Sequence, residues 1–225
     1  MTRFLVAAVS LCACAVGARA QLGIVDDIPG VFIDISNDPR ATILVLGDDD
    51  EGSFVTSIGN AVIPAGTVWV GNNGGLGVAP INEELEPLNA PLPSDGAWGG
   101  ARSLLPLWDD IGNDIGQVAV MQQDNRVIVQ WTGKPLNDSL ITFQVQIFDA
   151  SEASNPIAQF LYLDIDNADA AASATIGFQA GHTLNDVQWS FNRPGAVTDG
   201  TVLTLIPEPG CLTGLVFLAL LRRRR

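Results

Sequence analysis

Carboxylates are the residues of this chain best suited to chemistry, and they occur in short runs. Asp109 and Asp110 are adjacent, directly after Trp108, and Asp114 follows them. A glycosidase needs two carboxyl groups about 5 to 9 Å apart that face one cleft, whereas adjacent residues of a strand point to opposite faces. We therefore assign no catalytic residue, and we expect Asp109 to accept backbone N–H groups in the turn after Trp108.

A second oxygen-rich set follows a predicted strand. It consists of Asp164, Asp166, Asn167 and Asp169. Asp164 and Asp166 share one face of the strand, about 7 Å apart. Calcium takes six to eight oxygen ligands at about 2.3 to 2.6 Å, so this set is a candidate calcium site. The glycine-containing spacing of an EF-hand is absent, and an exposed strand end is the alternative.

Other polar residues favour structural roles. The acidic run at residues 48–51 precedes Gly52 and is typical of a solvated turn. His182 is the only histidine, so a histidine-based triad or a multi-histidine metal site has no partners here. The three cysteines are Cys12, Cys14 and Cys211. All fall in terminal segments, so residues 21–206 hold no disulfide and no thiolate site.

Trp98 is the one tryptophan that we expect to be exposed, because glycines and an aspartate surround it in residues 95–100. An exposed aromatic ring beside polar loops stacks on a sugar or a partner protein. Packing over an edge of the fold is the alternative. The other four tryptophans lie in or beside predicted strands and are expected in the core.

Period-2 alternation predicts the elements that position these residues. Residues 141–147 place Ile141, Phe143, Val145 and Ile147 on one face and polar side chains on the other, the pattern of a half-buried strand. Similar runs separated by Gly, Asn, Asp and Pro occur at residues 30–36, 42–46, 53–58, 67–71, 118–122, 126–131, 160–165, 175–179, 187–191 and 202–205. Ten or eleven such strands predict an all-β fold, an antiparallel, jelly-roll-like β-sandwich. Residues 81–100, rich in Pro and Gly, are expected to form one long loop.

The charge of the central part excludes one class of partner. Residues 21–206 contain five basic and 24 acidic residues, a formal net charge of −19. Nucleic acid and anionic lipid surfaces repel such a chain. A solvated extracellular surface accounts for this charge without any ligand.

Both ends of the chain indicate export. Residues 1–20 have a basic residue, an apolar run and the cleavage pattern Ala18-Arg19-Ala20, as in a secretory signal peptide; Cys14 offers lipidation as an alternative. The last nineteen residues resemble the PEP-CTERM sorting tail of exported bacterial proteins. The residues that carry this resemblance are Pro207, Glu208 and Pro209, an apolar run at residues 210–221, and Arg222, Arg223, Arg224 and Arg225. The resemblance implies recognition by an exosortase-type enzyme and a place in the envelope, on the cell surface or in the extracellular matrix.

The apolar run of the tail is short for a membrane span. Twelve helical residues measure about 18 Å, against a hydrocarbon core of about 30 Å. The prolines and Glu208 prevent its extension toward the N-terminus. We expect transient membrane association, with the arginines on the cytoplasmic side.

The central part carries a second resemblance. Residues 68–74 and 105–110 look like the "V-x-V-x-x-N-G" and "A-P-x-W-x-D" segments of a nidogen-like β-sandwich module of secreted bacterial proteins, and four further strand-like segments follow in the family's order. The chain departs from that pattern at Gly75, where an aromatic residue is usual, and in residues 55–65, which lack the aromatic-rich run. The resemblance implies an extracellular adhesion or matrix module without assigned catalysis.

The sequence thus predicts three parts: a signal peptide at residues 1–20, a β-sandwich at 21–206 and a sorting tail at 207–225. The predicted function is that of an exported structural or adhesion module, not an enzyme, whose partners are the export machinery, the sorting enzyme and extracellular polysaccharide. A carbohydrate-binding module and, behind it, a glycan-active hydrolase remain the alternatives.

Overall fold

The computed structural model describes residues 21–78, 83–135, 140–150, 156–165, 171–181 and 185–207, with the backbone alone for residues 112–116, 134 and 135. His182 and the tail beyond Pro207 lie outside this part. Pro207 itself is the last residue of the final strand, opposite Leu22.

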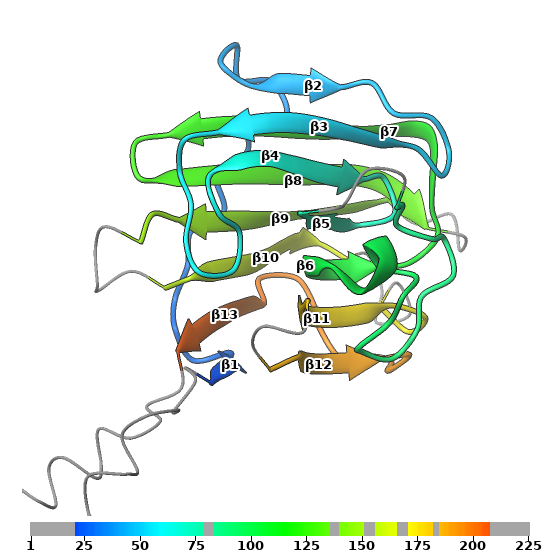
Figure 1. Cartoon of the computed structure of the whole chain (residues 1–225). Coiled ribbons are helices and arrows are strands. Elements are labelled where there is room, and N and C mark those ends of the chain that lie inside the picture. Colours follow the sequence, from blue (N-terminus) through cyan, green and yellow to red (C-terminus); the bar gives the residue numbers. More distant parts are fainter. Residues whose placement is uncertain are drawn as a thin grey trace, which may run out of the picture.

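The described residues form two antiparallel sheets packed face to face (Figure 1). Sheet A has seven strands in the order β1 (Leu22–Val25), β13 (Val202–Pro207), β10 (Ala158–Asp164), β9 (Ile141–Phe148), β8 (Arg126–Pro135), β7 (Ile111–Gln123) and β2 (Thr42–Leu44). Sheet B has six strands in the order β12 (Val187–Phe191), β11 (Thr175–Ala180), β6 (Arg102–Trp108), β5 (Gly75–Gly77), β4 (Gly66–Gly71) and β3 (Glu51–Thr56). The predicted antiparallel β-sandwich is confirmed, with thirteen strands in the described part instead of ten or eleven.

The core lies between the sheets and follows the alternation of the sequence. Phe143 and Val145 of β9 are fully buried there, as predicted. Phe143 stacks on Trp131 of β8 with 5.2 Å between the ring centroids. Aromatic pairs in this geometry add to the stabilisation from buried area alone, so β8 and β9 form the centre of the core.

Side-chain hydrogen bonds fix which strands of the two sheets face each other. The Trp131 indole N–H of β8 donates to the Gly71 carbonyl oxygen of β4 at 2.9 Å. The Tyr162 hydroxyl of β10 donates to the Pro106 carbonyl oxygen of β6 at 2.5 Å. Burial raises the pKa of Tyr162 well above its usual value, which keeps this donor protonated. These two hydrogen bonds therefore connect the two sheets through the interior, and each buried donor has an acceptor.

Residues 29–36, which we call the strap, correct one prediction. The alternation of residues 30–36 predicted a strand, but the chain here crosses the outer face of sheet A without joining its ladder. Glutamine side chains hold it instead. The strap residues bound, with the glutamine that contacts each, are Pro29 (Gln159), Val31 (Gln146), Ile33 (Gln144), Asp34 and Ile35 (Gln130) and Ser36 (Gln117). The polar face of the sheet is thus covered by the strap.

The predicted long loop is present in residues 83–100. It ends in one 3-10 turn, Trp98–Gly100, and folds back on itself through an isolated bridge between Leu85 and Ala97. Within the described part of the chain, we find no helix of the length and apolar content needed to cross a membrane.

Candidate functional site

Three carboxylates from two distant parts of the sequence meet at one corner of the sandwich. The acidic corner consists of Asp48 and Asp49, from the loop between β2 and β3, and Asp110, from the turn between β6 and β7. One carboxylate oxygen of each lies within 4.8 Å of the others. Asp48 and Asp49 are exposed and Asp110 is half-buried. Such a set of oxygens could hold a metal ion.

Two asparagines in the turn between β4 and β5 position the acidic corner. Asn72 accepts the Asp50 backbone N–H at 3.1 Å and donates to the Ile111 carbonyl oxygen at 2.9 Å. Asn73 accepts the Ile111 N–H at 3.1 Å and donates to the Asp49 carboxylate at 3.1 Å. Both side chains are buried. They tie the two acid-bearing loops to one turn, which explains why the loops meet.

The same turn requires glycine at its next position. Gly74 has a φ of 79°, and a Cβ there would lie 1.9 Å from the Leu107 carbonyl oxygen. Only glycine combines this conformation with so close an approach. The sequence Gly71-Asn72-Asn73-Gly74 is therefore a structural joint between β4, β6 and the acidic corner.

The electrostatics of the corner are those of crowded negative charge. Burial raises the pKa of Asp110, and the nearby charges of Asp49, Asp48 and Asp109 raise it further. No basic side chain among the described residues forms an ion pair with Asp48, Asp49 or Asp110. The salt bridge found among the described side chains joins Arg40 to Asp38, outside the corner. A bound cation would relieve this repulsion, since it supplies the missing positive charge.

Asp109 has the structural role that the sequence predicted. Its side chain is buried, its Oδ1 accepts the Asp110 N–H at 3.0 Å, and its Oδ2 accepts the Ser173 hydroxyl at 2.6 Å. Burial raises the pKa of Asp109, and these two hydrogen bonds lower it in part. Because both oxygens are engaged, Asp109 locks the turn after β6. The side chain of Asp114 lies outside the described residues.

The candidate calcium set at the end of β10 cannot be placed as a whole. Asp164 is the last residue of β10, whereas Asp166, Asn167 and Asp169 lie outside the described residues. Within the described part, the acidic corner is the group of three acidic side chains close enough for one ion. The sequence signals were two acidic runs about 60 residues apart, and only the fold brings them together.

Trp98 is buried, which corrects the expectation that it is exposed. Its exposed fraction is 0%, and it packs against Leu85, Leu105 and Trp108 on the outer face of sheet B. Its backbone N–H donates to the Glu84 carbonyl oxygen at 2.9 Å, so the loop of residues 83–100 holds the indole beneath it. The polar residues around Trp98 indicated a surface, but they belong to the loop that covers it. The alternative was packing over an edge of the fold; Trp98 does pack against the sandwich, but on the outer face of sheet B.

Glu51 joins this loop to β3. Its carboxylate accepts the Leu85 N–H. Burial raises the pKa of Glu51, while the Leu85 N–H and the nearby Trp98 indole lower it. The indole nitrogen has no hydrogen-bond partner within normal distance. We conclude that Glu51 anchors the loop of residues 83–100 to the sheet.

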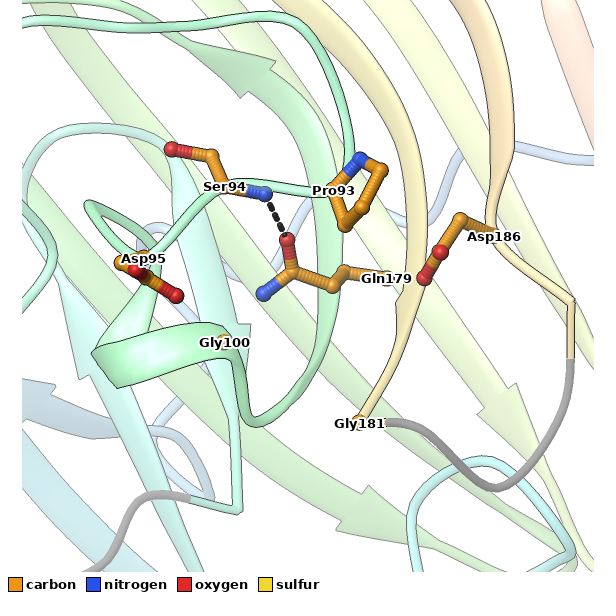
Figure 2. Close-up of a pocket in the computed structure, with 7 residues that line it drawn as sticks. All are labelled: Pro93, Ser94, Asp95, Gly100, Gln179, Gly181 and Asp186. Atoms are coloured by element: carbon orange, nitrogen blue, oxygen red, sulfur yellow. Dashed lines mark hydrogen bonds between the residues drawn. The ribbon is translucent and has the colours of Figure 1, made fainter.

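A small pocket lies beside the same loop (Figure 2). Its volume is about 150 Å³, and its lining includes Ser94, Asp95, Gln179 and Asp186. Gln179 accepts the Ser94 N–H at 2.6 Å and donates to the carbonyl oxygens of Ala97 and Ala101. Small-molecule sites usually measure about 300 to 1,000 Å³. Since Gln179 is saturated and the space is small, the pocket suits a few water molecules.

The acidic corner is thus the strongest candidate site of the described chain. Comparison with known proteins adds no precedent, since no family model, curated protein or solved structure matches the chain.

Proposed function

We propose that this protein is an exported structural or adhesion module of the cell surface or extracellular matrix. The observation that carries the proposal is the arrangement of a signal-peptide pattern, a β-sandwich and a Pro-Glu-Pro tail with four terminal arginines in one chain. The excess of acidic residues and the absence of cysteine from residues 21–206 suit an acidic, highly soluble exported domain. The export machinery and an exosortase-type sorting enzyme are its partners in this proposal.

The position of the tail supports its role as a sorting signal. The sandwich ends at Pro207, the first residue of the Pro-Glu-Pro segment. An enzyme at the membrane surface therefore has a defined boundary at which to separate the domain from the tail. The apolar run retains the chain transiently, and the arginines hold its end at the cytoplasmic side.

Replacement of Pro207, Glu208 and Pro209 by alanine tests sorting. We expect export to continue while processing stops, so that the full chain accumulates in the membrane fraction. Mass spectrometry of the surface fraction gives the C-terminus. Mature wild-type protein that still ends in Arg225 would refute the sorting proposal. Because Pro207 belongs to β13, Pro209→Ala alone serves as a matched variant that leaves the described strand unchanged.

A second proposal concerns the acidic corner, where we assign Ca²⁺ as the ion. Calcium prefers carboxylate and amide oxygens in flexible loops, and dissociation constants of 10⁻⁴ to 10⁻³ M are typical of extracellular modules. A cation here would stabilise the two loops that Asn72 and Asn73 join. The observation that favours it is the approach of three carboxylate oxygens to within 4.8 Å.

Thermal unfolding tests this assignment. At 10 mM Ca²⁺, mass action predicts about 1.4 to 2.7 kcal/mol of stabilisation, which raises the melting temperature by about 3 °C or more in a domain of this size. Mg²⁺ at the same concentration should have less effect. Asp110→Asn should abolish the shift, whereas Asp95→Asn, outside the corner, should retain it. An equal response to both ions in wild type and Asp110→Asn would refute the site.

Polysaccharide remains a candidate partner, but Trp98 does not support it. A buried indole offers no stacking surface to a sugar. The carbohydrate-binding and hydrolase alternatives therefore have no residue assigned among the described side chains.

A further inference from the structure

Sheet B has one strand fewer than sheet A, and the difference lies at one place. The Gln122 side-chain oxygen of β7 accepts the Thr56 hydroxyl of β3 at 3.0 Å and the Ser57 N–H at 3.2 Å, so β3 faces β7. Sheet A continues past β7 to β2, whereas sheet B ends at β3. Figure 1 shows β2 at the top of the sandwich, beyond both β3 and β7. The position opposite β2 and beside β3 holds no strand of the described chain.

The edge of β3 at this position is open. β3 pairs with β4 in an unbroken register from Glu51 to Thr56. Within the described part of the chain, no main-chain group of residues 52–55 forms a hydrogen bond to anything beyond β4. Proteins usually block such an edge with lysine, proline or a bulge, and β3 has none of these. Val55 of β3, on the outer face of sheet B, is 79% exposed.

An apolar surface overhangs the open edge. Leu44 of β2 and Leu46 after it are half-buried and pack against the core at Gly52. A Cβ at Gly52 would lie 3.0 Å from Leu46 Cδ2 and 3.4 Å from Leu44 Cδ1. A strand added beside β3 would therefore bury the remaining surface of both leucines. Burial of apolar surface and a new ladder of main-chain hydrogen bonds would both favour its binding.

We propose that the β3 edge binds one extended segment of another polypeptide, which joins sheet B antiparallel to β3 and beneath β2. Apolar side chains at alternate positions of that segment face Leu44 and Leu46. Its C-terminal end carries a basic residue, because an antiparallel strand ends next to the acidic loop, residues 48–50, that precedes β3.

The overhang decides against a second copy of this chain as the partner. If two β3 edges paired about a two-fold axis, β2 of each copy would occupy the place of β7 in the other. Neighbouring strands of one sheet are about 4.8 Å apart, so β2 of one copy and β7 of the other cannot share one position. A single extended segment avoids this clash. The proposal is independent of sorting and of calcium, and its test is run in EDTA.

The experiment uses the purified full chain and the synthetic peptide acetyl-Thr-Val-Thr-Val-Thr-Val-Lys-amide. Fluorescence anisotropy gives the affinity, and hydrogen exchange gives the location. We expect saturating peptide to slow amide exchange in residues 52–56 at least tenfold. A peptide of the same composition without alternation should bind at least tenfold more weakly. A peptide that ends in Glu instead of Lys should bind about threefold more weakly, the effect of one exposed ion pair.

Two matched variants locate the site on the protein. Val55→Lys places a charge on the outer face of the edge strand, next to the bound segment, and should weaken binding at least tenfold. Leu88→Lys alters a residue that is 78% exposed outside β3, and it should bind as the wild type does. Equal melting temperatures show that both variants are folded. No slowing of exchange in residues 52–56 at 1 mM peptide would overturn the proposal, as would equal loss in both variants. Concentration-dependent dimers protected at β3 would assign the edge to a second copy instead.

Discussion

Asn72 and Asn73 determine whether the acidic corner exists. Their side chains are 2% and 1% exposed, and each makes two hydrogen bonds to loops that carry the carboxylates. The carboxylates repel one another, so the corner forms because buried amides fix the backbone around it. The neutral amides of Asn72 and Asn73 thus fix the structure of the corner, and they position its charged carboxylates.

Asn72→Ala should destabilise the fold by about 2 kcal/mol, because it leaves the Ile111 carbonyl oxygen without its buried donor and the Asp50 N–H without its acceptor. Urea unfolding measures the change. Asn37→Ala is the control, since Asn37 is exposed and donates only to Ser36. A loss below about 0.5 kcal/mol would show that water replaces both bonds.

Asp110→Asn should stabilise the protein at pH 7 in EDTA. The pKa of Asp110 is raised in the folded state, so its ionised form costs stability above that pKa, and the cost disappears as the pH falls through it. The advantage of the variant should therefore shrink on acidification toward pH 4. Melting temperatures between pH 4 and 7 give the result, with Asp27→Asn as the control for removal of one surface charge. An advantage that grows on acidification would contradict the sign.

The strap shows how an element can depend on side chains alone. Its carbonyl oxygens and N–H groups meet the glutamines of β7, β8, β9 and β10 in reverse order of sequence, so the chain crosses four strands in eight residues. Gln130 illustrates the arrangement, since it accepts the Ile35 N–H at 2.9 Å and donates to Asp34 at 3.0 Å. The strap therefore has a glutamine partner in each of these four strands without being part of the sheet.

Gln130→Ala should loosen the strap locally. We expect the Ile35 amide to exchange about tenfold faster, the equivalent of one hydrogen bond, while amides of β9 keep their protection. The pKa of Asp34, which the Gln130 side chain lowers most, should rise toward its ordinary value. NMR measures both quantities. Uniform loss of protection through β9 would show that the strap and the sandwich open as one unit.

The elements also show what alternation predicts and where it fails. It predicted β9 and the buried residues of its inner face, because one side of that strand meets the core. It failed for residues 30–36, where Val31, Ile33 and Ile35 recur at every second position in a chain that no strand pairs with. It also predicted a half-buried strand at residues 141–147, although Gln144 and Gln146 on its polar face are both 0% exposed. A polar face that binds backbone and one that binds water have the same sequence pattern.

At the scale of the whole molecule, negative charge opposes folding. Residues 21–206 contain five basic and 24 acidic residues, so repulsion among carboxylates exceeds attraction.

The acidic corner could not be predicted from the sequence, because its two acidic runs lie about 60 residues apart. Residues 48–51 and 109–110 each resemble an ordinary turn. Trp98 was mispredicted because a covering loop and an exposed loop have the same composition.

Salt should raise the melting temperature. Screening weakens repulsion among exposed carboxylates, and the Debye length falls from about 30 Å at 0.01 M to about 8 Å at 0.15 M. We expect the melting temperature in EDTA to increase from 0.01 to 0.15 M NaCl, with a smaller increase in Asp110→Asn. Calorimetry measures both. A decrease would show that attractive pairs, such as Arg40 with Asp38, dominate the surface.

The place of β13 has a consequence for the timing of folding. β13 lies between β1 and β10 in sheet A, so the first described strand depends on the last for its pairing. β1 has no ladder until the chain has been made as far as Pro207. A chain that leaves the ribosome or a secretion channel from its N-terminus therefore cannot complete sheet A until nearly all of it has passed. The pairing of Leu22 with Pro207 thus joins the two ends of the domain and also delays the completion of sheet A until the last strand is available.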